Sequence, residues 1–165
     1  MTDAAALLTA LRERGWTLGV AESLTGGAVA AELVSVPGAS AVLLGAIVAY
    51  ATPVKHSLVG VDEELLAVHG PVHPAVAGQL ADRIRSAVAV DGRAADVGIG
   101  TTGIAGPDSP DGQPVGTVHI GVATPRGTSV SSSVFEGDRA AVRRQAVEAA
   151  ITAALHSLAE GALRE

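Results

Sequence analysis

The sequence predicts an α/β protein: a three-layer α/β/α sandwich with a mixed, mostly parallel sheet, as a single domain over residues 1–165. Short apolar runs alternate with segments of helical periodicity, which is typical of strands buried between two layers of helices. Near the end of the chain, two runs flank a Pro-Arg-Gly turn, so that part of the sheet is antiparallel. Hydrophobic residues make up 48% of the chain and aromatic residues only 2%, so we expect a core of small aliphatic side chains.

The first half of the chain predicts alternating helices and strands. Three leucines fall on one face of a helix over residues 3–14. The continuous apolar runs 17–21 and 43–50 are expected to be buried strands. The other helices expected in this half cover residues 28–36, a short segment opened by Thr52 as cap and Pro53, residues 62–69 and residues 74–90.

The second half predicts one more buried strand, a long loop, a hairpin and a last helix. The apolar run 97–102 leads into the loop 103–116, whose length is typical of functional or disordered segments. The remaining elements are hairpin strands at 115–123 and 129–135 and a helix capped by Asp138, with Gly161 after its end.

The segment 21–27, Ala-Glu-Ser-Leu-Thr-Gly-Gly, joins the first predicted strand to the helix that follows it. Hydroxyls and glycines at a helix start supply side-chain oxygens and backbone N–H groups, which stabilise an anion or a developing oxyanion. Ser23 and Thr25 are therefore candidates for a nucleophile or a ligand contact, while Gly26 and Gly27 let a ligand approach the backbone. The alternative is an ordinary capped connection with nothing bound.

Lysine occurs once among the eleven basic residues, at Lys55. Lysine can lose its proton when burial lowers its pKa, whereas arginine cannot, so a single lysine is a candidate general base. Three predicted strands end at polar groups, namely Ser23, Tyr50 with Lys55, and Thr102. Ligands bind beyond such strand ends in α/β sheets. If the strands are parallel, Lys55 can meet Ser23 and take its hydroxyl proton.

Arg139 lies in the first turn of the last predicted helix, where a cation opposes the helix dipole. A bound anion would offset this unfavourable interaction between the arginine and the helix dipole. A phosphate matches the forked guanidinium groups of Arg139 and of Arg143, which lies one turn later. The alternative is a solvated arginine paired with Glu136 or Asp138, which the local pattern favours.

Composition argues against several classes of function. The net charge of −6 and the lack of a basic stripe argue against nucleic-acid binding. The absence of cysteine removes disulfides, thiol nucleophiles and thiolate metal sites. The five histidines have no metal-ligand spacing, and His119 is interpreted as a satisfied structural residue. Without a leader-like or membrane-spanning apolar run, we expect a soluble cytoplasmic protein that uses neither metal nor cofactor.

Several segments of the chain match one known pattern in the same order: 21–27, 36–40, 49–50 with Lys55, 58–61, 102–107, 114–118 and 137–139. Together they closely resemble the CinA C-terminal domain family, the nicotinamide-nucleotide amidohydrolases, over about residues 5–160. The resemblance implies a three-layer α/β/α fold. Some members of the family carry an additional N-terminal pyrophosphatase domain, and this chain resembles the stand-alone members that do not. It also implies hydrolysis of nicotinamide mononucleotide to nicotinate mononucleotide and ammonia.

The resemblance further implies roles for individual residues. Ser23 resembles the nucleophile, Lys55 its general base, and Tyr50 an auxiliary hydroxyl near these two. Thr102 and Arg139 match positions that hold the substrate, with Arg139 facing its 5′-phosphate. The other predicted substrate contacts are Thr25, Gly103 and the backbone donors of Gly26 and Gly27.

Two other functions stay open on the sequence alone. A non-catalytic nucleotide-binding or regulatory domain would keep the same pocket without turnover. A DNA-associated competence or damage protein is suggested by the family name, against the acidic charge of the chain. As partners we expect nicotinamide mononucleotide, no nucleic acid, no membrane, and further copies of the chain in a homo-oligomer, with a dimer favoured.

Overall fold

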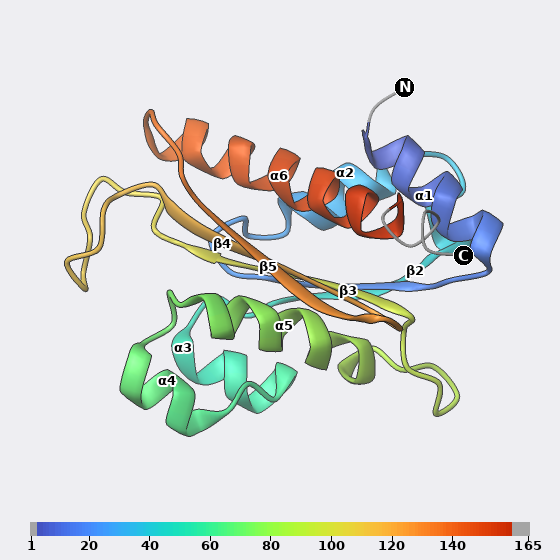
Figure 1. Cartoon of the computed structure of the whole chain (residues 1–165), viewed down its shortest axis with the longest axis horizontal. Coiled ribbons are helices and arrows are strands. Elements are labelled where there is room, and N and C mark those ends of the chain that lie inside the picture. The colour runs from blue at the N-terminus through green and yellow to red at the C-terminus, as the bar shows by residue number, and fades with distance from the viewer. Residues whose placement is uncertain (1–2, 160–165) are drawn as a thin grey trace.

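The computed structural model describes residues 3–159, and Figure 1 shows its helices and strands. The helices are α1 (Asp3–Arg14), α2 (Ala28–Val34), α3 (Thr52–Val54), α4 (Glu63–His69), α5 (Pro74–Ala87) and α6 (Arg139–Ala159), with a 3₁₀ turn η1 (Ala39–Ala41) and a π-helical turn η2 (Lys55–Val59). The strands are β1 (Leu18–Glu22), β2 (Leu43–Val48), β3 (Val97–Gly103), β4 (Thr117–Thr124) and β5 (Gly127–Val134).

The strands form one sheet in the order β2-β1-β3-β4-β5. β1 is parallel to β2 and β3, while β4 is antiparallel to β3 and β5, so β4 alone runs against the other strands of this sheet. Figure 1 shows α1, α2 and α6 on one face of the sheet and α3, α4 and α5 on the other. The predicted three-layer α/β/α sandwich with a mixed, mostly parallel sheet is confirmed.

Each helical layer packs on the sheet through its own apolar core. Leucines, valines and alanines of α1, α2 and α6 form one buried cluster with the sheet, and α4 and α5 contribute to a second. Trp16 and Phe135 are only partly buried beside the first cluster, so the core is made of small aliphatic side chains, as the composition predicts. Among residues 3–159, no helix has the length and apolar character needed to cross a bilayer.

Glycines in the central strands let α5 approach the sheet closely. A Cβ atom at Gly98 would lie 1.8 Å from the carbonyl oxygen of Ala81, and Gly121 on β4 is obstructed in a similar way. Only a residue without a side chain fits at such a distance. The start of α5 is thereby held beside the end of β3, where the Thr102 hydroxyl donates to the carbonyl oxygen of Pro71 (2.6 Å).

The predicted helices and strands are present with ends within about three residues, but two details are wrong. β2 is an edge strand that pairs only with β1, so it is not buried on both faces and Val48 is 46% exposed. Thr52 does not cap its helix, because the N-cap position is Ala51, which has no side-chain oxygen. Asp138 does cap α6 as predicted. Gly161 lies outside the described residues.

Candidate active site

Ser23 and Lys55 meet at the carboxyl edge of the sheet. Ser23 directly follows β1, and Lys55 is the first residue of η2, after β2. The Nζ atom of Lys55 donates a hydrogen bond of 2.9 Å to Oγ of Ser23. It also donates to the carbonyl oxygens of Ala49 (2.8 Å) and Tyr50 (3.1 Å). The contact that the parallel strand ends predict is therefore present.

Lys55 is enclosed by protein and has only neutral hydrogen-bond partners. Its exposed fraction is 1%, and none of its three acceptors is a carboxylate. Burial lowers the pKa of Lys55 from 10.5 to about 8, because the ammonium group loses its hydration and no opposite charge compensates for the loss. The neutral amine is thus populated near pH 8, and in that form it can accept the hydroxyl proton of Ser23.

The turn that carries Ser23 is held by β3 and α6. The N–H of Ser23 donates to the carbonyl oxygen of Thr101 (3.1 Å), and the hydroxyls of Thr25 and Thr101 lie 2.8 Å apart. The guanidinium of Arg143 donates to the carbonyl oxygens of Leu24 (2.9 Å) and Thr25 (3.0 Å). The buried Thr25 hydroxyl therefore supports the turn and does not enter the site. Arg143 likewise binds the turn and is not positioned as an anion ligand.

The N-terminus of α2 does bind an anion, but that anion is Glu22 of the same chain. The Glu22 carboxylate is fully buried and accepts hydrogen bonds from the N–H groups of Gly27 (3.0 Å), Val29 (3.0 Å) and Ala30 (2.9 Å). A carboxylate at this position satisfies N–H groups that have no partner within the helix and complements its dipole. The predicted alternative of a capped connection describes this helix start, but the capping side chain is Glu22 and not Ser23 or Thr25.

The backbone donors expected at Gly26 and Gly27 are consequently not available. Besides the Gly27 contact with the carboxylate, the N–H of Gly26 donates to the carbonyl oxygen of Ser23 (3.0 Å). Within residues 3–159, the N–H groups of Leu24 and Thr25 are the ones in this turn without an acceptor. The backbone conformation of the turn leaves these two N–H groups without an acceptor. The residue types in the sequence do not predict that conformation.

Arg139 reaches the site from the start of α6. Its guanidinium donates to the Tyr50 hydroxyl (2.9 Å) and to the carbonyl oxygen of Gly106 (2.9 Å). In the described part of the chain it forms no ion pair with Glu136 or Asp138. The Tyr50 side chain is 58% exposed and its hydroxyl contacts Arg139, so only its backbone carbonyl belongs to the surroundings of the buried lysine. The auxiliary hydroxyl expected beside the dyad is thus engaged elsewhere.

A cavity of about 220 Å³ opens where these groups meet. Of the residues predicted from the sequence, six line it: Ser23, Tyr50, Lys55, Thr102, Gly103 and Arg139. The α4–α5 connection and the loop after β3 complete the wall. The length of that loop and its match to the family pattern over 102–107 pointed to it from the sequence, but no role in the site was predicted for the remaining lining residues, which are Leu24, Pro71, Val72, Ile104, Ala105, Gly106, Asp108 and Pro110.

A profile of the CinA C-terminal domain matches residues 2–158 of this chain. The chain belongs to the CinA family. A CinA-like protein of Frankia casuarinae is 48% identical over 145 residues, and one of Anaeromyxobacter dehalogenans is 50% identical over 143 residues. These matches cover 88% and 86% of this chain but 32% and 34% of the two relatives. The chain therefore spans about a third of the length of these relatives.

Solved structures of the CinA superfamily share the fold. A CinA superfamily protein from Klebsiella pneumoniae superimposes with a TM-score of 0.89 at 33% identity over 96% of both chains. A competence/damage inducible protein from Agrobacterium tumefaciens gives a TM-score of 0.81 at 29% identity, again over 96% of both chains. These names state no reaction, so the chemistry of the CinA site is argued from its geometry.

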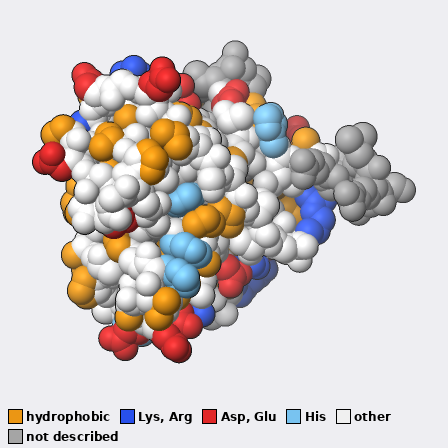
Figure 2. All heavy atoms as spheres, turned by 60° about the vertical axis from the view of Figure 1, so that its left-hand side comes forward, with side chains coloured by type: hydrophobic (Ala, Val, Ile, Leu, Met, Phe, Trp, Pro, Cys, Tyr) orange, Lys and Arg blue, Asp and Glu red, His pale blue; other side chains and the backbone are white. Residues whose placement is uncertain are grey.

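Histidines also lie on the surface of this CinA domain, and Figure 2 shows them among hydrophobic side chains on one face. The rings of His69 and His73 stack with centroids 4.4 Å apart.

His119 contacts the Ser132 hydroxyl through Nδ1 (2.7 Å), but its buried Nε2 has no partner within residues 3–159, so the ring is only half satisfied. Burial and the nearby charge of His73 lower the pKa of His119. In the same residues, no histidine or carboxylate group is arranged to hold a metal ion.

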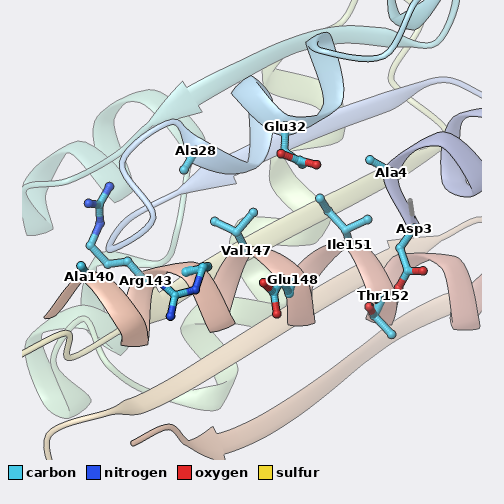
Figure 3. Close-up of a pocket in the computed structure, with 11 residues that line it drawn as sticks. Asp3, Ala4, Ala28, Glu32, Ala140, Arg143, Val147, Glu148, Ile151 and Thr152 are labelled. Carbon is cyan, nitrogen blue, oxygen red and sulfur yellow. Dashed lines mark hydrogen bonds between the residues drawn. The ribbon is translucent and has the colours of Figure 1, made fainter. Parts of the chain in front are cut away.

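A larger cavity of about 750 Å³ lies between α1, α2 and α6 of this CinA domain. Figure 3 shows Val147 and Ile151 of α6 facing it, with Glu32 of α2 across from Glu148. Of the residues considered for catalysis or anion binding from the sequence, Arg143 lines this cavity, and its guanidinium is engaged with the carbonyl oxygens of Leu24 and Thr25. The smaller cavity beside Ser23 is therefore the candidate active site, since the single lysine of the chain lines it together with a serine hydroxyl.

Proposed function

We propose that this CinA domain is a nicotinamide-nucleotide amidohydrolase, which converts nicotinamide mononucleotide into nicotinate mononucleotide and ammonia. One observation carries the proposal: the single lysine of the chain is buried, has no carboxylate partner, and lies 2.9 Å from a serine hydroxyl in a cavity. A buried amine of this kind is the general base that a serine nucleophile needs when no histidine is present.

In the proposed reaction, Oγ of Ser23 attacks the carboxamide carbon while Nζ of Lys55 takes the hydroxyl proton. The unpaired N–H groups of Leu24 and Thr25 are the candidate donors to the oxyanion, and a donor of this kind contributes about 3 kcal/mol. Protonated Lys55 then gives its proton to the amide nitrogen, which leaves as ammonia. Water hydrolyses the acyl-serine by the same steps in reverse.

The shape and charge of the site support a nucleotide substrate. The volume of about 220 Å³ is below the range of about 300–1,000 Å³ that encloses a drug-sized ligand. It therefore suits the pyridine ring, with the ribose phosphate extending outward. Arg139 at the wall has no carboxylate partner in the described part of the chain, and its guanidinium can bind a phosphate.

The direct test is release of ammonia from nicotinamide mononucleotide, measured without added metal and with Ser23→Ala as the matched control. We expect release by the wild-type chain and none above background by the variant. Thermal shift measurements on both proteins report binding separately. Stabilisation by the nucleotide without ammonia release would contradict the enzyme and support the non-catalytic nucleotide-binding alternative.

Arg139→Met is expected to raise the KM for nicotinamide mononucleotide by roughly 10- to 100-fold with little change in kcat. A hydrogen bond to a charged group is worth about 1.5–3 kcal/mol, which corresponds to this factor. Steady-state kinetics with nicotinamide riboside, which lacks the phosphate, provide the control. An equal loss with the riboside would mean that Arg139 supports the Gly106 loop instead of the phosphate.

A further inference from the structure

The connection between α4 and α5 forms one wall of the candidate active site. Pro71 and Val72 line the cavity, and His73 follows them as the N-cap residue of α5. Two hydrogen bonds hold this segment. The Thr102 hydroxyl donates to the carbonyl oxygen of Pro71 (2.6 Å), and Nε2 of Gln113 donates to the carbonyl oxygen of Val72 (2.9 Å). His73 is therefore directly bonded to the wall, and its conformation affects where the wall lies.

The side chain of His73 caps α5 through a ring nitrogen that carries no proton. Its Nδ1 atom accepts a hydrogen bond from the backbone N–H of Ala75 (3.2 Å). A backbone N–H can only donate, so Nδ1 must present its lone pair and the ring must be neutral. Serine, threonine and asparagine make the same contact with an oxygen that does not titrate. The cap of α5 is thus a group that loses its acceptor when it takes up a proton.

Other titratable groups approach this segment from three elements. From α4, the ring of His69 stacks on the ring of His73 with centroids 4.4 Å apart. From β4, His119 lies near enough that the charge of His73 lowers its pKa, in addition to the larger effect of burial. From the loop after β3, the Asp111 carboxylate accepts from Nε2 of Gln113, the atom that also donates to the wall. Two of these three neighbours are imidazoles, which cannot compensate a positive charge on His73.

His119 is poorly placed to take up a proton itself. It points to the same face of the sheet as Gly121, two residues later on β4, where a Cβ atom would collide with the carbonyl oxygen of Ala77 on α5. The His119 side chain is 6% exposed, and its Nε2 has no partner among residues 3–159. An imidazolium there would bury a charge and an unpaired N–H group. The response to acid therefore falls to His73, which is only partly buried.

We propose that His73 is a pH-sensitive latch on the wall of the active-site cavity. Neutral His73 caps α5 and keeps Pro71 and Val72 in place at the site. Protonation removes the acceptor at Nδ1 and puts a positive charge at the N-terminus of α5, where it opposes the helix dipole. The first turn of α5 then frays and the wall loosens, so that the cavity binds its ligand less tightly in acid.

The latch acts on the shape of the cavity, whereas Lys55 acts on the reaction inside it. His73 is not among the residues that line the cavity. The cap is a property of the protein alone, so the latch goes beyond the proposed function, and only its effect on the binding of nicotinamide mononucleotide rests on that function. Because both groups would lower activity in acid, exchange at α5 and binding without turnover separate the two effects.

His73→Asn tests the cap, because asparagine keeps a capping oxygen but does not titrate. In amide hydrogen exchange, corrected for the intrinsic rate, we expect the protection of the Ala75 N–H in the wild type to fall about fivefold from pH 7.5 to pH 5.5, as for loss of a cap of typical strength. His73→Asn should show no such fall. His156→Asn removes an exposed histidine from α6, on the other side of the sheet, and should behave like the wild type. An equal fall in His73→Asn would overturn the proposal.

Binding of nicotinamide mononucleotide to the Ser23→Ala protein tests the wall without turnover. By calorimetry at pH 7.5 and pH 5.5, we expect affinity to fall about fivefold more for Ser23→Ala than for the same protein carrying His73→Asn. The nucleotide phosphate also titrates in this range, but it does so equally for both proteins. Equal falls in affinity would contradict the latch. Absence of binding to both proteins would contradict the proposed function, and protection of the Ala75 N–H would then decide on the latch.

Discussion

Lys55→Met is expected to lower the rate of ammonia release from nicotinamide mononucleotide by roughly 10⁴-fold. Methionine fills a similar volume in a buried site but has no amine, so no group within reach of Ser23 can accept its proton. Positioned acid–base groups contribute about 10²–10⁴-fold, and removing one member of a catalytic dyad disables the other. Steady-state and single-turnover ammonia assays measure the loss.

The pH dependence of the wild-type reaction follows from the same amine. The pKa of Lys55 is lowered to about 8, so the neutral base is the minor form at pH 7 and the major form above pH 8. We therefore expect kcat/KM to rise about tenfold per pH unit below pH 8 and to level off above it. A profile that is flat from pH 6 to 9 would contradict Lys55 as the base.

Stability provides a control that does not depend on activity. In the unfolded chain Lys55 keeps its pKa of 10.5, whereas in the folded chain the pKa is about 8. Between these values the unfolded state binds more protons, so the free energy of unfolding rises with pH across this window. Relative to Lys55→Met, the wild type should gain on the order of 3 kcal/mol between pH 7 and pH 11, measured by urea denaturation.

The meeting of Ser23 and Lys55 could be predicted because it depends on strand direction. Continuous apolar runs predict parallel strands, and parallel strands bring their carboxyl ends to one edge. The long loop after β3 could be placed at that edge for the same reason. Arg139 could be singled out because a cation in a first helical turn is unfavourable without an acceptor nearby.

The details inside the turn could not be predicted, because they depend on which of several acceptors each N–H finds. Glu22 belongs to a strand whose five residues are all buried, and its carboxylate turns back to bind the helix that follows. That one contact removes Gly27 as a ligand donor. Pro71 and Val72 line the cavity only because α5 packs closely on the glycines of the central strands, and no local pattern signals this.

Glu22→Gln is expected to lower the free energy of unfolding by about 2–4 kcal/mol. The carboxylate accepts three N–H groups with its two oxygens, at 2.9–3.0 Å. An amide has a single acceptor oxygen, so its NH₂ group would face a backbone donor in a fully buried position. Charge-assisted hydrogen bonds contribute about 1.5–3 kcal/mol each, and the charge at the helix N-terminus adds to this. Urea denaturation at pH 7 measures the change.

Glu32→Gln is the matched control, because it removes the same charge from an exposed position on α2. We expect that variant to change stability by less than about 0.5 kcal/mol, as exposed substitutions usually do. If Glu22→Gln lost no more than this, the start of α2 would owe its stability to packing of its apolar face and not to the carboxylate. The turn that carries Ser23 would then be held by its contacts with Thr101, Arg143 and Lys55, and the internal anion would have no part in building the site.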